Sequence, residues 1–326
     1  FGGFIGYNLV QKLKEKFQIT TLDNFSSQSN YTIKLARAEQ LGIENYDLFK
    51  TQKKLQKDKV TFHYADLCNL QELQNIFSST SFDVVIHLAA LVGVRQSLLF
   101  PQAYIDSNVN GFINLIECAK NAGIKHFIYA SSSSVYGLNA KTPYEENQKT
   151  DSPISVYAAS KKSNELLASV YSNLYGMNLI GLRFFTVYGP WTRPDMAAHI
   201  FMKAILENKP IDLFNEGKMI RDFTYVDDIV NSIELLIQKI QIEKTAVNHI
   251  FNIGNHHPIF TIDFLRLIEK AMNKKATINF KPMQPGDMLA TNADCEKLYN
   301  YIGYKPNTSI EEGVQKMVEW FLGFYK

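Results

Sequence analysis

The sequence predicts an α/β protein with a doubly wound parallel sheet and a smaller mixed α/β lobe towards the C-terminus. Three observations predict this fold class. Short apolar segments alternate with helical patterns at the spacing of strand–helix units. Residues 82–90 (FDVVIHLAA) are almost continuously apolar, as in a strand that is buried on both faces of a parallel sheet. After Phe185, glycine and proline break the chain into shorter elements, which indicates a separate lobe.

Composition limits the class of protein and its partners. The 326 residues carry 34 Lys and Arg against 32 Asp and Glu, without a basic block, so we expect no nucleic-acid partner. The apolar runs are far too short to span a bilayer, so we expect no membrane partner. Three cysteines share no metal-ligand spacing and are too few for a disulfide framework. We therefore expect no metal and a reducing, cytoplasmic location.

The first element is a glycine-rich turn that leads into a helical pattern. Gly3 and Gly6 would let the backbone approach a pyrophosphate, which then lies on the N-terminus of the helix. Glycines before a helix also occur without a ligand, so this turn alone does not decide. Phe1 stands inside the turn and is not Met, so we expect a first strand to precede it.

The next strand, residues 17–24, ends in an acidic residue. Asp23 follows Gly3 by 20 residues, the spacing at which a carboxylate binds the hydroxyls of the adenosine ribose. A carboxylate there repels a 2′-phosphate and no Arg stands beside it, which favours NAD over NADP. The turn and Asp23 together predict a dinucleotide site and a Rossmann-like sheet.

Later strands end at further candidate residues, after a polar surface stretch at residues 25–58 to which we assign no chemistry. Asp66 either binds the adenine amine or caps the helix that starts near Asn69. Ala89 and Ala90 are small enough for a cofactor to pass close by. His87 is interpreted as a core histidine with satisfied hydrogen bonds rather than as a catalyst.

Two helical stretches, residues 102–122 and 156–175, are apolar on more than one side. Such helices commonly bury the outer face in a second copy, so we expect a homodimer through them. Strands at 127–130, 179–184 and 250–253 continue the sheet. We therefore assign residues 1–185 with 218–255 to an NAD-binding domain, and residues 186–217 with 256–326 to a substrate lobe over the C-terminal edge of the sheet.

The candidate catalytic pair is Tyr157 and Lys161, one helical turn apart on one face. Chance alone gives about one Tyr-x-x-x-Lys pair in such a chain. This sequence has three, but only this pair follows a strand-borne serine cluster, residues 131–134, and begins a helix. The alternative for the cluster is a turn or a helix cap.

The chemistry of these residues suits proton transfer to and from an alcohol. A free phenol titrates near pH 10, too high for a base at neutral pH. The ammonium of Lys161 and the positive nicotinamide ring of NAD⁺ would both favour phenolate and lower the pKa of Tyr157. Lys161 can also bind the nicotinamide ribose, and Ser132 can bind the reacting oxygen.

A larger set of motifs runs through the chain: residues 87–90 (HLAA), 93–95 (GVR), 131–137 (SSSSVYG), 183–191 (RFFTVYGPW), 193–197 (RPDMA), 221–228 (RDFTYVDD) and 283–287 (MQPGD). With them the sequence resembles the extended short-chain dehydrogenase/reductase superfamily, specifically the nucleotide-sugar epimerases. Within that group it is most similar to the UDP-glucuronate 4-epimerases. The resemblance covers residues 3–324.

The resemblance implies an isomerase that holds NAD⁺ tightly and uses Tyr157, Lys161 and Ser132 as its catalytic set. The tyrosine takes the proton of the sugar 4-OH while carbon 4 gives hydride to the nicotinamide. The 4-keto sugar then turns and receives the hydride on its other face, so that UDP-glucuronate becomes UDP-galacturonate. Supply of precursors for polysaccharide biosynthesis is the family-level expectation. Expected cofactor contacts, besides Tyr157 and Lys161, are Gly3, Phe4, Ile5, Gly6, Asp23, Asn24, Asp66, Leu67, Leu88, Ala89, Ala90 and Asn108.

The resemblance also implies a substrate site. Decarboxylases and dehydratases of the superfamily carry an acid where this chain has Ser134, so no acid is available to start chemistry at carbon 5. Thr186 and Arg193 are candidates for holding the sugar carboxylate, with Arg193 able to pair with both oxygens. The alternative for Arg193 is a surface ion pair. The remaining expected substrate contacts are Arg95, Ser133 and, for the uridine diphosphate, Arg221, Gln284 and Asp287.

Two other functions stay open at this point. One is 4-epimerisation of another UDP-sugar, such as UDP-glucose, UDP-galactose or an N-acetyl form, which would keep Tyr157 and NAD. The other is a non-catalytic NAD-binding sensor or scaffold. Such a protein would not need the serine together with Tyr157 and Lys161.

Overall fold

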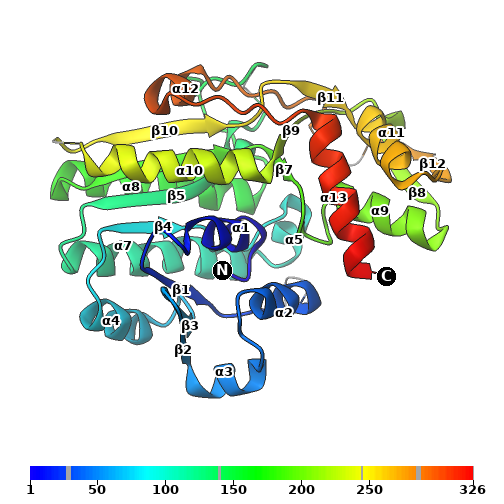
Figure 1. Ribbon diagram of the computed structural model, residues 1–326. Coiled ribbons are helices and arrows are strands. Elements are labelled where there is room, and N and C mark those ends of the chain that lie inside the picture. The colour runs from blue at the N-terminus through cyan, green and yellow to red at the C-terminus, as the bar shows by residue number, and fades with distance from the viewer. Residues whose placement is uncertain (27–30, 139–140, 244, 284–287, 326) are drawn as a thin grey trace. The chain divides into compact units, whose positions relative to one another are not determined.

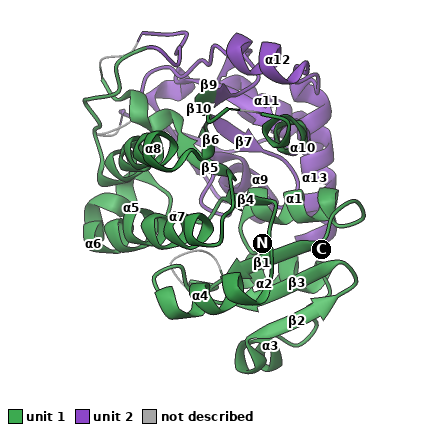
Figure 2. Ribbon diagram, turned by 90° about the vertical axis from the view of Figure 1, so that its left-hand side faces the viewer, with its two compact units in different colours: residues 1–140, 148–183, 232–251 green, residues 141–147, 184–231, 252–326 purple. Residues whose placement is uncertain are grey.

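The computed structural model describes residues 1–26, 31–138, 141–243, 245–283 and 288–325 (Figure 1). The chain forms two compact units (Figure 2). Unit 1 contains Phe1–Ala140, Gln148–Arg183 and Ser232–Phe251. Unit 2 contains Lys141–Asn147, Phe184–Asn231 and Asn252–Lys326.

Unit 1 contains parallel strands, as the sequence predicts. One sheet has the order β10 (Asn248–Ile253), β6 (Asn178–Phe184), β5 (His126–Ser132), β4 (Val84–His87), and β4 and β5 are parallel. A second sheet has the order β1 (Ile19–Asp23), β3 (Val60–Tyr64), β2 (Lys54–Lys57). In it β1 runs parallel to β3, whereas β2 and β3 form an antiparallel pair that the sequence did not predict. The α/β class with a parallel sheet is confirmed.

Helices alternate with these strands in unit 1. The polar stretch at residues 25–58 contains α2, α3 and β2. The predicted helix at residues 102–122 is divided, because a π-helical turn, η1, joins α6 to α7. A buried cluster that includes Phe112, Phe127 and Leu179 forms the core between α7, β5 and β6. The helices are α1 (Phe4–Leu13), α2 (Tyr31–Gln40), α3 (Tyr46–Gln52), α4 (Leu70–Ser79), α5 (Val94–Leu99), α6 (Pro101–Ile105), η1 (Asp106–Asn110), α7 (Gly111–Asn121), the 3-10 turn η2 (Ser133–Tyr136) and α8 (Val156–Tyr175). A further helix, α10 (Val226–Gln241), begins in unit 2 and continues in unit 1.

The burial predicted for residues 82–90 is wrong in part. Val84, Val85 and Ile86 are half-buried, and within β4 only His87 is buried. The reason is the position of the strand, because β4 is the last strand in the order of its described sheet and pairs there with β5 alone. Its apolar composition therefore predicted the strand correctly but overestimated its burial.

Unit 2 is a mixed α/β unit, as predicted. Its three-stranded sheet has β9 (Ile220–Tyr225) in the middle, parallel to β7 (Thr186–Tyr188) and antiparallel to β11 (Pro258–Phe260). β8 (Ile211–Phe214) and β12 (Ile278–Lys281) form a parallel pair. The rings of Phe223 and Phe264 stack at a centroid distance of 3.9 Å in the core. The other elements are α9 (Ala197–Glu207), η3 (Asn215–Gly217), α11 (Thr261–Met272), α12 (Glu296–Ile302) and α13 (Ile310–Tyr325).

The strand β9 explains one difference from the expected domain limits. Residues 218–231, which the sequence placed with the first domain, lie in unit 2, since β9 pairs with β7 and β11. Residues 141–147 also lie in unit 2, where Tyr144 bridges to Ala293. Within the described ranges, none of the helices combines the length and apolar character that crossing a bilayer requires.

Candidate active site

The helix α8 carries both residues of the candidate catalytic pair near its start. Ser155 caps this helix, and its hydroxyl oxygen accepts a hydrogen bond from the amide of Ala158 at 3.1 Å. Lys161 is only 1% exposed, and its ammonium donates a hydrogen bond to the carbonyl oxygen of Ala130 at 2.9 Å. Burial lowers the pKa of Lys161 to about 8. The ammonium of Lys161 therefore lies against the end of β5, at Ala130, which precedes Ser132 by two residues.

The serine cluster forms the end of β5 and the turn η2. Ser132 is buried, and its Oγ accepts a hydrogen bond from the amide of Ser134 at 3.2 Å. This is the capping bond that the turn alternative predicts, and it leaves the hydroxyl hydrogen of Ser132 available for another acceptor. Gly137 ends the turn at a φ of 59°, and a Cβ atom there would collide with the carbonyl oxygen of Ser152. The chain thus needs glycine where the serine turn meets the segment that leads to α8.

Tyr104, on α6, contacts the ring of Tyr157, the candidate catalytic tyrosine. The two rings meet edge to face, with centroids 6.3 Å apart and planes at 81°. The Tyr104 hydroxyl donates to the carbonyl oxygens of Val92 and Gly93, at 2.7 and 3.1 Å. Tyr104 therefore links the loop after β4 to Tyr157. The sequence analysis missed this residue, although its position four residues before Asn108 on one helical face was an available signal.

Asn108 lies in the π-helical turn η1 and is fully buried. Its Nδ2 donates to the carbonyl oxygen of Leu91 at 2.9 Å and to Oγ of Ser160 at 3.1 Å. The Ser160 hydroxyl in turn donates to the carbonyl oxygen of Tyr157 at 2.8 Å. Because the amide of Asn108 is used within the protein, these contacts indicate a positioning role. A direct contact between Asn108 and the cofactor stays a prediction.

The glycine turn and the end of β1 lie against each other. The amide of Gly2 donates to Oδ2 of Asp23 at 3.1 Å. Gly3 caps α1 without a side-chain hydrogen bond, and the first turn of α1 has no acidic residue. A Cβ atom on Gly3 would meet no atom within 4 Å, so there is room beside the turn. An uncapped helix N-terminus next to a strand-end carboxylate fits the pyrophosphate and ribose of a dinucleotide.

Two basic residues of α2 contact the glycine turn and the end of β1, and the sequence analysis missed both. The Lys34 ammonium lies 3.3 Å from Oδ1 of Asp23. The Arg37 side chain is buried and donates to the carbonyl oxygen of Gly2 at 2.6 Å. Their spacing of three residues on an amphipathic helix was the signal, since it places both on one face.

Asp66 follows β3 and does not cap α4. Asn69 caps that helix by accepting from the amide of Glu72 at 3.2 Å. Asp66 instead accepts from Nδ2 of Asn24 and from the amide of Cys68, each at 2.8 Å. Asn24 and Asp66 thus contact each other beyond the ends of the parallel strands β1 and β3, as expected for cofactor candidates at one sheet edge. The neighbouring Leu67 is buried.

Further cofactor and substrate candidates of unit 1 follow β4. Leu88 and Ala90 are half-buried and Ala89 is exposed, and Arg95 is exposed on α5. Phe4 is buried and Ile5 half-buried in the first turn of α1. Ser133 and Ser134 are half-buried in η2. The contacts predicted for these residues stay predictions.

The interpretation of His87 as a satisfied core histidine is wrong in its hydrogen bonding. The ring is 2% exposed, and its Nε2 has no hydrogen-bond partner in the described part of the chain. It packs against Phe112 at a ring-centroid distance of 5.6 Å. Burial, with a smaller effect of Lys161, lowers the pKa of His87 to about 3. The side chain is therefore a neutral imidazole at physiological pH.

The candidate substrate residues of unit 2 are only partly described. Thr186 begins β7 and is half-buried. Arg193 donates from Nε to Oδ1 of Asp195 at 2.9 Å and also contacts Oδ2, which is the ion pair that the alternative predicted. The Arg221 guanidinium donates to the carbonyl oxygen of Ile220 at 2.8 Å. Gln284 and Asp287 lie outside the described residues.

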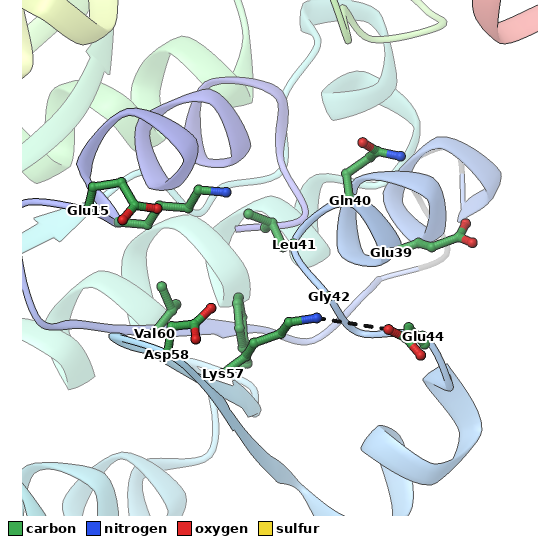
Figure 3. A pocket seen from close by; sticks show the side chains of 11 residues that line it. Glu15, Glu39, Gln40, Leu41, Gly42, Glu44, Lys57, Asp58 and Val60 are labelled. Atoms are coloured by element: carbon green, nitrogen blue, oxygen red, sulfur yellow. Dashed lines mark ion pairs between the residues drawn. The ribbon is translucent and has the colours of Figure 1, made fainter.

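A recess of about 190 Å³ lies elsewhere in unit 1 (Figure 3). It is lined by the ends of α1 and α2 and by the β2–β3 turn, and it includes none of the candidate site residues. Lys57 crosses it and pairs with Glu44 at 3.9 Å (Figure 3). Over the described ranges, no group of three or more His, Cys, Asp or Glu residues is placed to hold a metal ion.

The sequence matches a family model and curated relatives. Residues 1–254 match the NAD dependent epimerase/dehydratase family. The chain is 41% identical to Protein CapI of Staphylococcus aureus, over 99% of this chain and 97% of that protein. It is 39% identical to UDP-glucuronate 4-epimerase 4 of Arabidopsis thaliana, over 99% of this chain and 74% of the plant protein.

Solved structures share the fold over almost the whole chain. The UDP-glucuronic acid 4-epimerase of Bacillus cereus, in complex with UDP-glucuronic acid and NAD, has a TM-score of 0.88 at 31% identity and covers 99% of this chain and 98% of its own. The UDP-N-acetylglucosamine 4-epimerase of Methanobrevibacter ruminantium M1, in complex with UDP-N-acetylmuramic acid, has a TM-score of 0.84 at 28% identity, with coverage of 99% and 96%. Both similarities extend through unit 1 and unit 2.

Proposed function

Because the chain belongs to the NAD dependent epimerase/dehydratase family, we propose that it interconverts UDP-glucuronate and UDP-galacturonate by inverting carbon 4 of the sugar. The resemblance to nucleotide-sugar epimerases is confirmed, and the chain is an NAD-dependent UDP-sugar 4-epimerase, an isomerase. The choice of UDP-glucuronate is our proposal. The observation that carries the chemistry is the buried ammonium of Lys161, held at the end of β5 one helical turn after Tyr157.

Unit 1 is the part of the chain to which we assign the cofactor. The backbone amides at the start of α1, where Gly3 makes no side-chain capping bond, would hold the pyrophosphate, and Asp23 would hold the adenosine ribose. Lys161 would bind the nicotinamide ribose. When bound, NAD⁺ supplies an acceptor for the hydride of carbon 4 and later returns that hydride to the same carbon.

The protein supplies the proton transfer. Tyr157 accepts the proton of the sugar 4-OH and later returns it to the same oxygen, so that no net proton is consumed. The ammonium of Lys161 favours the phenolate form of Tyr157. Its hydrogen bond to the carbonyl oxygen of Ala130 fixes the position of this ammonium. Ser132 Oγ, oriented by the amide of Ser134, donates a hydrogen bond to the reacting oxygen.

The proposal of a uronate rests on two features of the sequence. Ser134 stands where an acid would start chemistry at carbon 5, so the 4-keto uronic acid keeps its carboxylate. Arg193 offers a planar pair of donors that it now directs at Asp195. A substrate carboxylate would replace Asp195 at this guanidinium, with Thr186 as a second contact.

The second candidate is 4-epimerisation of another UDP-sugar. The ion pair between Arg193 and Asp195 supports it, since a paired arginine needs no substrate carboxylate. The likeness to the UDP-N-acetylglucosamine 4-epimerase supports it too. Both candidates use Tyr157 in the same way.

We also propose that two copies associate through the helical stretches at residues 102–122 and 156–175, the second of which is α8. Leu166, Val170 and Leu174 follow one another at four-residue steps on one face of α8, and all three are exposed, Leu174 to 68%. Leu98 and Leu99 of α5 are exposed as well. Contiguous apolar surface of this kind is usually covered by another protein surface.

The test is to incubate full-length protein with UDP-glucuronate and to follow the anomeric proton signals by NMR. Appearance of UDP-galacturonate supports the proposal. Conversion of UDP-glucose or UDP-N-acetylglucosamine without conversion of the uronate would favour the second candidate. No conversion of any UDP-sugar would contradict both. Tyr157→Phe, which removes only the phenolic oxygen, is the matched inactive control.

A further inference from the structure

A buried ion pair joins α8 to the end of β6 beyond the catalytic residues. Glu165 and Arg183 are 5% and 3% exposed. Arg183 donates from Nε to Oε1 at 2.8 Å and from Nη2 to Oε2 at 2.9 Å, a fork-to-fork arrangement. Burial opposes ionisation of Glu165, but the bonds from Arg183 hold the pKa of the carboxyl group below its usual value. Both groups are therefore charged, in a place where charges are costly to bury.

This pair touches both sides of the serine turn. The hydroxyl of Ser131 donates to Oε1 of Glu165 at 2.7 Å. The guanidinium of Arg183 lies 4.7 Å from the ring centre of Tyr136. Ser131 directly precedes Ser132, and Tyr136 is the last residue of η2. The turn that presents Ser132 is thus fixed at its entry and at its exit by one ion pair.

The same helix also binds the preceding residue of β5. Lys161 donates to the carbonyl oxygen of Ala130, and Glu165 accepts from the neighbouring Ser131. Tyr157, Lys161 and Glu165 are spaced by four residues, so they share one face of α8. Two successive residues of β5 are therefore attached to the helix that carries the catalytic tyrosine.

We propose that Glu165 and Arg183 are positioning residues that act through Ser131 to set the orientation of Ser132. None of the three contacts substrate or cofactor in this scheme. The inference rests on the proposed function, because the task of Ser132 is to hold the reacting oxygen. It adds that the buried ion pair, and not the turn alone, sets the orientation of the Ser132 hydroxyl.

The test compares Ser131→Ala in two backgrounds of the full-length NAD-bound enzyme. Ser131→Ala removes one hydroxyl and leaves both partners of the ion pair in place, so we expect the fold to be retained. In the wild-type background we expect kcat to fall by about tenfold with KM unchanged, because a misplaced group loses transition-state contact. In the Ser132→Ala background we expect no further fall in kcat, since the hydroxyl that Ser131 would orient is absent. Equal losses in both backgrounds, or no loss in the first, would overturn the proposal.

A matched control is available on α8. Ser163→Ala removes a hydroxyl that, among the described residues, bonds within the helix, to the carbonyl oxygen of Ala159 at 2.9 Å. This variant should keep the wild-type kcat. If Ser163→Ala lowers kcat as much as Ser131→Ala, the effect belongs to α8 in general and the proposal fails.

A second measurement does not depend on turnover. Hydrogen exchange of peptides covering residues 131–137 reports the amide of Ser134, which bonds to Ser132 Oγ. Ser131→Ala should raise this exchange rate by about tenfold, and Ser163→Ala should not. Unchanged exchange in Ser131→Ala would overturn the proposal even in an active enzyme. Absence of epimerisation by the wild type would instead contradict the proposed function, while this measurement would still decide the positioning role.

Discussion

The side chain of Asn108 exchanges two hydrogen bonds with the backbone of Leu91. Its Oδ1 accepts from the amide of Leu91 at 2.8 Å, and its Nδ2 donates to the carbonyl oxygen at 2.9 Å. Through Ser160 the same amide is connected to the backbone of Tyr157. A single side chain in a π-helical turn therefore couples the loop after β4 to the first turn of α8.

Asn108→Ala should lower the free energy of unfolding by about 1–3 kcal/mol, because it leaves the peptide groups at Leu91 without their partners. Urea denaturation at constant pH measures this change. Asn110→Ala is the matched control, since Asn110 lies in the same turn and bonds the exposed carboxylate of Asp106 at 3.2 Å. Equal effects of the two substitutions would contradict the coupling.

Tyr157→Phe should reduce kcat by about 10²- to 10⁴-fold while NAD remains bound, since only the proton-transferring oxygen is lost. Single-turnover assays with UDP-glucuronate, together with NAD quantified after denaturation, measure both quantities.

Tyr104→Phe keeps the ring against Tyr157 and removes the bonds to Val92 and Gly93. We expect this second variant to lose about 1 kcal/mol of stability and to remain active.

The buried Lys161 should make stability depend on alkaline pH. Its folded-state pKa of about 8 lies below the unfolded value of 10.5, so the unfolded chain binds more protons between these values. The cost of burying the charge is therefore complete below pH 8 and is progressively relieved between pH 8 and 10.5. Lys161→Met should be more stable than wild type at pH 7, by about 1–3 kcal/mol, and this advantage should shrink by pH 10.

Lys162→Met is the control for that experiment, because the Lys162 ammonium is partly exposed and pairs with Glu165 at 3.2 Å. A stability gain in Lys162→Met equal to that in Lys161→Met would contradict the assignment to burial. The activity of the wild type should change with pH in the opposite direction to its stability. Wild-type kcat should fall as pH rises through 8, because the ammonium that supports the phenolate is lost.

Arg193→Ala should reduce turnover of UDP-glucuronate at least about tenfold more than turnover of UDP-glucose, since only the uronate offers a carboxylate to this guanidinium. Steady-state assays on both sugars measure the difference. Asp195→Asn, which weakens the ion pair of Arg193, should lower KM for the uronate. Equal losses on both sugars in Arg193→Ala would defeat the carboxylate assignment and favour the second candidate function.

Leu174→Lys should shift the protein from dimer to monomer, because it places a charge in the exposed apolar face of α8. Sedimentation velocity at several concentrations measures this shift. Leu289→Lys, at an exposed leucine of unit 2, is the control and should leave the oligomeric state unchanged. A wild-type monomer at all concentrations would refute the proposed association.

The sequence predicted those features that depend on local pattern. Strand–helix alternation identified the fold class, and the serine cluster before Tyr157 and Lys161 identified the candidate catalytic residues. The contacts of Lys34, Arg37 and Glu165 were not predicted. These residues lie on ordinary amphipathic helices, and their partners are 11 to 35 residues away in sequence, at Asp23, Gly2, Ser131 and Arg183.

The errors have physical causes as well. Apolar composition does not reveal how many neighbours a strand has, so the burial of β4 was overestimated. His87 was expected to be a core histidine with satisfied hydrogen bonds, whereas its Nε2 has no partner in the described part of the chain and its ring packs against Phe112. Residues 218–231 lie in unit 2, whereas the sequence analysis assigned them to the first domain, because local sequence does not reveal that β9 pairs with β7.

The close approach of Gly137 to the carbonyl oxygen of Ser152 has a consequence for evolution and engineering. It brings the serine turn and the approach to α8 to a common point, so the intervening segment leaves and returns at nearly the same place. Any residue with a side chain at position 137 would push these two backbone segments apart and displace the serine turn from the segment that leads to α8. Position 137 is therefore expected to remain glycine among relatives with unchanged chemistry, and engineering of the turn should leave it unchanged.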